Sequence, residues 1–151
     1  MIPHSEFRIP HYPMPPFTIT RRVEFGDTDM AGIVHFANFF RFMESAETAF
    51  LRSLGLSVSW RNDAKKLGFP RVSASCDFLA PARFEDELTI AVTVERVGTK
   101  SVTYRHDFTN QRGERVAVGR ITAVFVRHDT DRIESAEIPP EIRSKLAEHV
   151  A

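Results

Sequence analysis

Apolar and polar residues alternate between Phe17 and Phe25, with threonine, arginine and glutamate between the apolar positions. Successive side chains of a β-strand point to opposite faces, so this alternation predicts a strand with one buried face. Beyond the turn at 26–32 the spacing changes to three or four residues and predicts a helix from Phe36 to Leu54. The apolar residues at this spacing are Phe36, Phe39, Phe40, Met43, Ala46, Phe50 and Leu54.

The predicted helix has an apolar surface wider than one stripe, because Phe42, Ala49 and Leu51 lie beside the main series. We therefore expect the helix to be largely enclosed, and Gly55 to end it as the C′ residue.

Four later segments are rich in β-branched and aromatic residues and predict strands that enclose this helix. They are Val72–Leu79, Leu88–Val97, Val102–Thr109 and Val116–Val126. Short turns between them favour antiparallel neighbours. A further short helix is expected within Pro139–Val150. The prediction is an α+β fold in which a five-stranded antiparallel sheet wraps around one long central helix.

The last strand, Val116–Val126, is apolar on both faces, with Val118 and Val124 on one and Ile121 and Phe125 on the other. One face must then meet something besides the helix, since a contiguous exposed apolar patch is unfavourable in water. A homo-oligomer is the simplest expectation.

Five of the first sixteen residues are proline, which fixes φ and removes a backbone donor. Residues 1–16 are therefore expected to form an arm, and residues 17–151 a single domain. The 151 residues are 42% apolar and 26% charged, a globular composition of one-domain size.

Twenty basic residues balance twenty acidic ones, so no large positive field favours a nucleic acid or an anionic membrane. No apolar run approaches the roughly 20 residues that cross a bilayer. Cys76 has no cysteine to pair with, and the N-terminal sequence lacks the apolar run of a secretory signal. We expect a cytoplasmic protein.

Candidate chemistry lies in the turn Gly26–Gly32, which joins the first strand to the helix and carries Asp27, Thr28 and Asp29. These residues could simply cap the helix and close the turn. Unpaired N–H groups at a helix start can also stabilise a carbonyl oxygen that gains negative charge, and a nearby carboxylate can attack or activate water. Both interpretations are open on pattern alone.

The segment EFGDTDMAGIV, followed by HFANFF, resembles the motif D-x-D-x-x-G-[IV]-V that opens the helix of the 4-hydroxybenzoyl-CoA thioesterase family. The stretches PARFEDELTI and TKSVTYRH are similar to that family too, and the resemblance covers roughly residues 17–138. It implies a hotdog fold and an acyl-CoA thioesterase. No cofactor or metal is expected, since the sequence has no P-loop and no Gly-rich dinucleotide fingerprint. The resemblance also implies a homodimer with pockets built from both chains, and a homotetramer as a dimer of dimers.

By this resemblance Asp29 is the catalytic carboxylate and Asp27 holds the turn, while the backbone of Phe36 meets the oxyanion and Gly32 permits close approach. Asp29 could attack the thioester carbonyl or act as general base on water. The leaving thiol has a pKa near that of cysteine, about 8.5, so no strong general acid is required. The Phe-rich helix suggests an aromatic or short- to medium-chain acyl group.

A histidine at the start of a largely apolar helix is more often a packed or pocket-lining residue than a catalyst, so His35 is expected to pack at the pocket. Catalysis by His35 is the alternative. Glu44 is expected on an enclosed part of the helix, where it would either bind a polar group of the acyl chain or pair with an arginine across a subunit contact. Lys100 and Ser101 follow a tight turn and by resemblance contact coenzyme A, although a solvated turn lysine is equally expected.

Two alternatives to the thioesterase are a hotdog dehydratase acting on hydroxyacyl thioesters, which His35 suggests, and an acyl-CoA binding module without chemistry. This chain lacks the Pro-Gly sequence expected before the helix of a hotdog dehydratase. The presence of Asp29 argues against a binding module without chemistry. The six histidines show no metal-site spacing.

Overall fold

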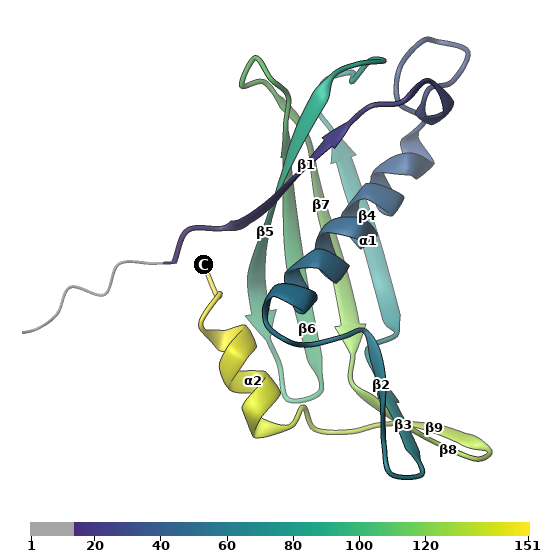
Figure 1. Cartoon of the computed structure of the whole chain (residues 1–151), viewed down its shortest axis with the longest axis vertical. Helices are drawn as coiled ribbons and strands as arrows, with labels where there is room; N and C mark the ends of the chain where they lie inside the picture. The colour runs from purple at the N-terminus through teal and green to yellow at the C-terminus, as the bar shows by residue number, and fades with distance from the viewer. Residues whose placement is uncertain (1–13) are drawn as a thin grey trace, which may run out of the picture.

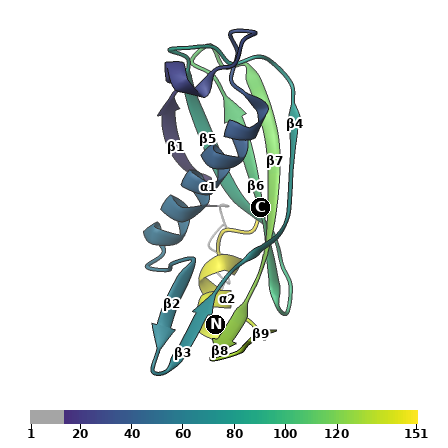
Figure 2. The same cartoon turned by 90° about the vertical axis from the view of Figure 1, so that its right-hand side faces the viewer.

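The computed structural model describes residues 14–151 and consists of a curved sheet with a long helix along one face (Figure 1). The main sheet is antiparallel with the strand order β1-β5-β6-β7-β4. Its strands are β1 (Phe17–Arg22), β4 (Arg71–Phe78), β5 (Glu87–Val97), β6 (Ser101–Thr109) and β7 (Arg115–Val124). Figure 2 shows the sheet curling around the helix from β1 to β4. The predicted five-stranded fold is confirmed.

The long helix α1 (Phe36–Ser53) buries the face that its periodicity predicts. Its buried residues are Phe39, Phe42, Met43, Ala46, Glu47, Phe50 and Leu51. Leu54 is the C-cap, and Gly55 follows with φ +72°, a left-handed conformation that glycine adopts without strain. The expectation that α1 is largely enclosed is wrong for the single chain, because Arg41 and Glu44 are exposed.

A second antiparallel sheet, which the sequence did not predict, has the strand order β2-β3-β8-β9. Its four-residue strands are β2 (Ser59–Asn62), β3 (Lys65–Gly68), β8 (Val126–Asp129) and β9 (Arg132–Ser135). This small sheet lies at the end of the molecule away from the start of α1 (Figure 2). The predicted strand 116–126 is thereby divided, because β7 ends at Val124 and Val126 opens β8.

The outer face of the main sheet is more polar than the sequence suggested. On β7, Arg120 and Thr122 lie between Val118 and Val124, and the Arg120 guanidinium pairs with Glu95 of β5 at 2.9 Å. Arg105 and Asp107 form a second ion pair on β6 at 3.0 Å. The continuous apolar face that we expected on 116–126 is therefore absent from this part of the described chain.

The C-terminal helix α2 (Pro140–Ala147) confirms the expected short helix and buries Ile142 and Leu146 against the core. Residues 14–16 have no regular structure, and the rest of the expected arm lies outside the described residues. Among residues 14–151, no helix is both long enough and apolar enough to span a membrane.

Candidate active site

The chain between β1 and α1 is held by its own acidic residues. A short 3-10 helix, η1 (Phe25–Asp27), follows Glu24, whose backbone N–H donates to Oδ2 of Asp27 at 2.8 Å. The Asp27 carboxylate also faces the Arg21 guanidinium at 3.8 Å, and its carbonyl oxygen accepts bonds from the His35 N–H and the Asn38 side chain. Asp27 thus has the geometry of a residue that fixes the turn.

Asp29 begins a tight turn that returns the chain toward α1. Its N–H donates to the carbonyl of Ile33 at 2.9 Å, and its own carbonyl accepts the Gly32 N–H at 3.0 Å. One carboxylate oxygen accepts the Ala31 N–H at 2.9 Å. Gly32 has φ +76°, which only glycine adopts readily. The turn fixes Asp29 by its backbone and leaves the rest of its carboxylate exposed.

Asp29 opens onto a cavity of about 450 Å³ between the start of α1 and the segment after β4. The residues that line it are Asp29, Ile33, Val34, Phe36, Phe39, Phe78, Leu79, Ala80, Pro81 and Ala82. Asp29 is the single ionisable group among these lining residues, so a carboxylate stands at the edge of an otherwise apolar cavity. This combination suits a ligand with an apolar body and a polar reacting group.

The N–H of Phe36, at the start of α1, is a free donor in the described part of the chain. The side-chain Nδ1 of His35 accepts the N–H of Ala37 at 3.1 Å, and the His35 carbonyl accepts the N–H of Asn38 at 2.9 Å. The N–H of Phe36 has no acceptor within residues 14–151. A helix start leaves such donors free for a ligand oxygen.

His35 is the N-cap of α1, and its ring stacks on Phe36 with centroids 4.6 Å apart. It does not line the cavity, and neither does Gly32, although both belong to the same turn. The structure therefore does not place His35 on the cavity wall, and a role for it in the site stays a prediction.

Glu44 is not enclosed, contrary to the sequence-based expectation. Its side chain is 64% exposed and faces the guanidinium of Arg71 in the same chain at 3.8 Å. The buried carboxylate of α1 is instead Glu47, one turn later, which is fully buried and accepts a hydrogen bond from Nε of Arg71 at 3.2 Å. Helical periodicity did not distinguish the two, because the facing partner, Arg71, lies on a distant strand.

Lys100 and Ser101 do not meet Asp29 within one chain. Ile33, in the Asp29 turn, forms an isolated antiparallel β-bridge with Arg83, which comes just before β5 begins. Lys100 comes just after β5 ends. The 11 residues of β5 therefore separate them, roughly 35 Å at about 3.3 Å per residue. Figure 1 shows the β5–β6 turn at the opposite end of the sheet from the start of α1.

The cavity wall formed by Phe78–Ala82 was not anticipated as part of the site. This segment begins at Phe78, the last residue of β4. The antiparallel pairing of β4 with β7 brings Phe78 beside Phe39, and the two ring centroids lie 5.2 Å apart. No group of three or more metal-ligating side chains occurs in the described part of the chain.

Residues 23–146 match the family model of the thioesterase-like superfamily. The chain is 33% identical over 131 residues to the 4-hydroxybenzoyl-CoA thioesterase of Pseudomonas sp. strain CBS-3, covering 82% of this chain and 92% of that protein. It is 32% identical over 108 residues to a 1,4-dihydroxy-2-naphthoyl-CoA hydrolase of Thermosynechococcus vestitus, covering 72% and 74%.

Solved structures of thioesterases have the same fold as this chain. A gentisyl-coenzyme A thioesterase is 35% identical, with a TM-score of 0.74 over 86% of this chain and 99% of that one. The 4-hydroxybenzoyl-CoA thioesterase structure from Pseudomonas sp. strain CBS-3 is 27% identical, with a TM-score of 0.74 over 87% and 99%. The fold and these relatives identify a hotdog-fold thioester hydrolase, which confirms the predicted enzyme class. The chain belongs to the thioesterase-like superfamily, as its resemblance to the 4-hydroxybenzoyl-CoA thioesterase family indicated.

Proposed function

We propose that the protein hydrolyses an aromatic or short- to medium-chain acyl-CoA to the free acid and coenzyme A, with Asp29 as the catalytic carboxylate. The observation that carries this proposal is the position of Asp29 as the single ionisable group on an apolar cavity at the start of α1. Three of the lining residues are phenylalanines, which suit an aromatic acyl group. The named relatives act on hydroxybenzoyl-, dihydroxynaphthoyl- and gentisyl-CoA, which are aromatic thioesters.

In the general-base route, Asp29 takes a proton from water as the water oxygen bonds to the thioester carbonyl carbon. The carbonyl oxygen becomes negative and accepts the N–H of Phe36, the free donor of the helix start. Collapse of this intermediate breaks the C–S bond and releases the thiolate, which takes up the proton. In the nucleophilic route, Asp29 itself forms the new C–O bond to the acyl carbon, and the C–S bond breaks to release the coenzyme A thiolate. Water then hydrolyses the resulting mixed anhydride, which frees the acid and restores the Asp29 carboxylate. Both routes require the same carboxylate.

The site proposed for coenzyme A, Lys100 and Ser101, requires a second chain, since both lie at the far end of the sheet from Asp29 in one protomer. We propose a homodimer, with a homotetramer formed by two dimers.

The edge strand β4 supports a subunit interface. Its apolar side chains Val72 and Phe78 are 62% and 50% exposed, and an edge strand has unpaired backbone groups. Sedimentation velocity with native protein and Val72→Lys tests this, and a fully active monomer contradicts it.

The direct test is the release of free thiol from aromatic, short-chain and long-chain acyl-CoAs. Asp29→Asn keeps an oxygen for the Ala31 N–H but removes the charge, so it should lower kcat by at least a hundredfold while leaving the fold intact. Asp131→Asn, an exposed change in the β8–β9 turn, is the matched control and should keep full activity. Full activity in Asp29→Asn contradicts the assignment.

The binding-module and dehydratase alternatives make different predictions in the same assay. A module binds acyl-CoA saturably without releasing thiol. A dehydratase removes water from a hydroxyacyl thioester and retains the thioester. The thioesterase proposal fails if either pattern is observed with the native protein.

A further inference from the structure

A second pocket, of about 340 Å³, lies on the small sheet, away from the Asp29 cavity. Its residues come from the start of β2, from β3 and the residues that lead into β4, and from β8 and β9. Six of them are apolar, namely Val58, Leu67, Phe69, Pro70, Val126 and Ile133. The volume is that of a small organic molecule.

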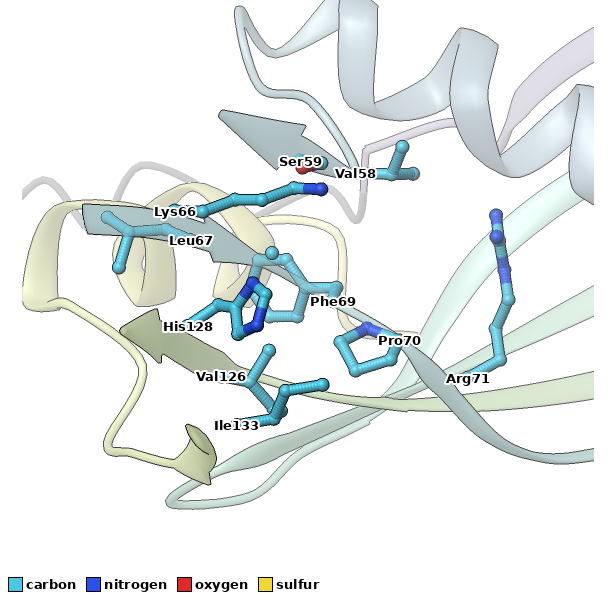
Figure 3. Close-up of a pocket in the computed structure, with 11 residues that line it drawn as sticks. Val58, Ser59, Lys66, Leu67, Phe69, Pro70, Arg71, Val126, His128 and Ile133 are labelled. Carbon is cyan, nitrogen blue, oxygen red and sulfur yellow. The ribbon is translucent and has the colours of Figure 1, made fainter. Parts of the chain in front are cut away.

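Basic groups are the only ionisable side chains in this lining: Lys66, His128 and Arg71. Lys66 and His128 are cross-strand partners of β3 and β8, so their side chains lie next to each other on one face. His128 is in turn paired with Ile133 of β9. Figure 3 shows these three side chains together at one side of the pocket and Arg71 at the other.

The charge of Arg71 is already matched by Glu47 at 3.2 Å and Glu44 at 3.8 Å. Lys66, in contrast, has no ion pair within residues 14–151. The pocket therefore combines one uncompensated positive charge, a neighbouring imidazole that can donate a hydrogen bond, and an apolar surface.

We propose that this pocket binds a small monocarboxylate with an apolar body, whose carboxylate is held by Lys66 and His128 and whose body lies against Val126 and Ile133. One lysine balances a single negative charge, whereas a phosphate dianion would leave its second charge unbalanced, because Arg71 is already paired with Glu47 and Glu44. The inference does not depend on the proposed thioesterase reaction, although the acid product of that reaction belongs to the same chemical class.

The chain contains a reporter for this pocket. Trp60 is the single tryptophan of the sequence, and its ring centroid lies 6.1 Å from that of Phe69, which lines the pocket. Binding should therefore change the Trp60 emission saturably. Cyclohexanecarboxylate and octanoate serve as probes, and cyclohexanecarboxamide and inorganic phosphate as counterparts that lack the charge or the apolar body.

We expect saturation with the two carboxylates and none with the amide or with phosphate. Lys66→Met should raise the dissociation constant about tenfold, the loss of one charge-assisted hydrogen bond. Lys65→Met is the matched control, because the adjacent side chain of a strand points to the opposite face and should leave binding unchanged. Circular dichroism verifies the fold of both variants.

Asp29→Asn separates the two sites. It should lower thiol release at least a hundredfold and leave the carboxylate-dependent change in Trp60 emission unchanged. The failure of one proposal is thus seen independently of the other. The pocket proposal is overturned if the native protein gives no saturable change, if Lys65→Met and Lys66→Met weaken binding equally, or if phosphate binds as well as the carboxylates.

Discussion

The guanidinium of Arg71, at the first residue of β4, donates to the fully buried carboxylate of Glu47 on α1 at 3.2 Å. Burial raises the pKa of Glu47, and the nearby Arg71 charge opposes that rise. The other carboxylate oxygen of Glu47 has no hydrogen-bond partner in the described part of the chain. This pair ties the central helix to an edge strand through the core.

Arg71→Met should lower the free energy of unfolding by about 3 kcal/mol near neutral pH, since Glu47 is left as a buried charge without its partner. The loss should be smaller at pH 5 than at pH 8, because protonation of Glu47 removes the buried charge. Urea unfolding at the two pH values measures this. The double variant Glu47→Leu/Arg71→Met should recover most of the loss, and a double variant no more stable than Arg71→Met contradicts this account.

His106 should make the protein sensitive to acid. Its side chain is fully buried on β6, neither ring nitrogen has a hydrogen bond of good geometry within residues 14–151, and burial lowers its pKa from 6.5 to about 4, with the Asp107 charge opposing. Between these two pH values the unfolded chain binds the proton and the folded chain does not, so stability falls as the pH decreases from 6.5 to 4. The total loss is about 3 kcal/mol.

Chemical denaturation from pH 7 to pH 4 tests this, with His106→Leu as the comparison. His106→Leu should lack the part of the stability loss between pH 6.5 and pH 4 that His106 causes. Equal pH dependence in the two proteins would falsify the assignment to His106.

The two aspartates of the turn should differ in their effect on stability. Asp27→Ala removes the acceptor for the Glu24 N–H and the partner of Arg21, and should cost about 1 kcal/mol. Asp29→Ala removes one exposed bond to the Ala31 N–H, which water can replace, and should cost less than about 0.5 kcal/mol. Calorimetry measures both, and an equal decrease in Tm contradicts the division of roles.

Gly119 of β7 permits Met43 of α1 to lie directly on the sheet. A Cβ at this position would stand 2.5 Å from both Sδ and Cε of Met43, so Gly119→Ala should cost about 1–3 kcal/mol through displacement of that side chain. In a double-mutant cycle with Met43→Ala, the double variant should be more stable than the sum of the single losses predicts. If the two losses of unfolding free energy are strictly additive, this account is contradicted.

Local pattern was sufficient for the main elements. The alternation of β1, the 3.6-residue period of α1 and the left-handed Gly55 depend on residues near in sequence, and all three were predicted at nearly their observed positions. The turn motif likewise identified the family and its class of enzyme, because the motif is continuous in the chain.

Contacts between distant segments were decided only by the tertiary structure. Glu44 and Glu47 lie on the same helix and both face Arg71 of β4, yet the Glu47 side chain is fully buried and the Glu44 side chain is 64% exposed. The small sheet was missed because β3 pairs with β8, about sixty residues later, through strands of four residues that have too few positions to show a period. The cavity wall at Phe78–Ala82 likewise depends on the pairing of β4 with β7, two strands far apart in the sequence.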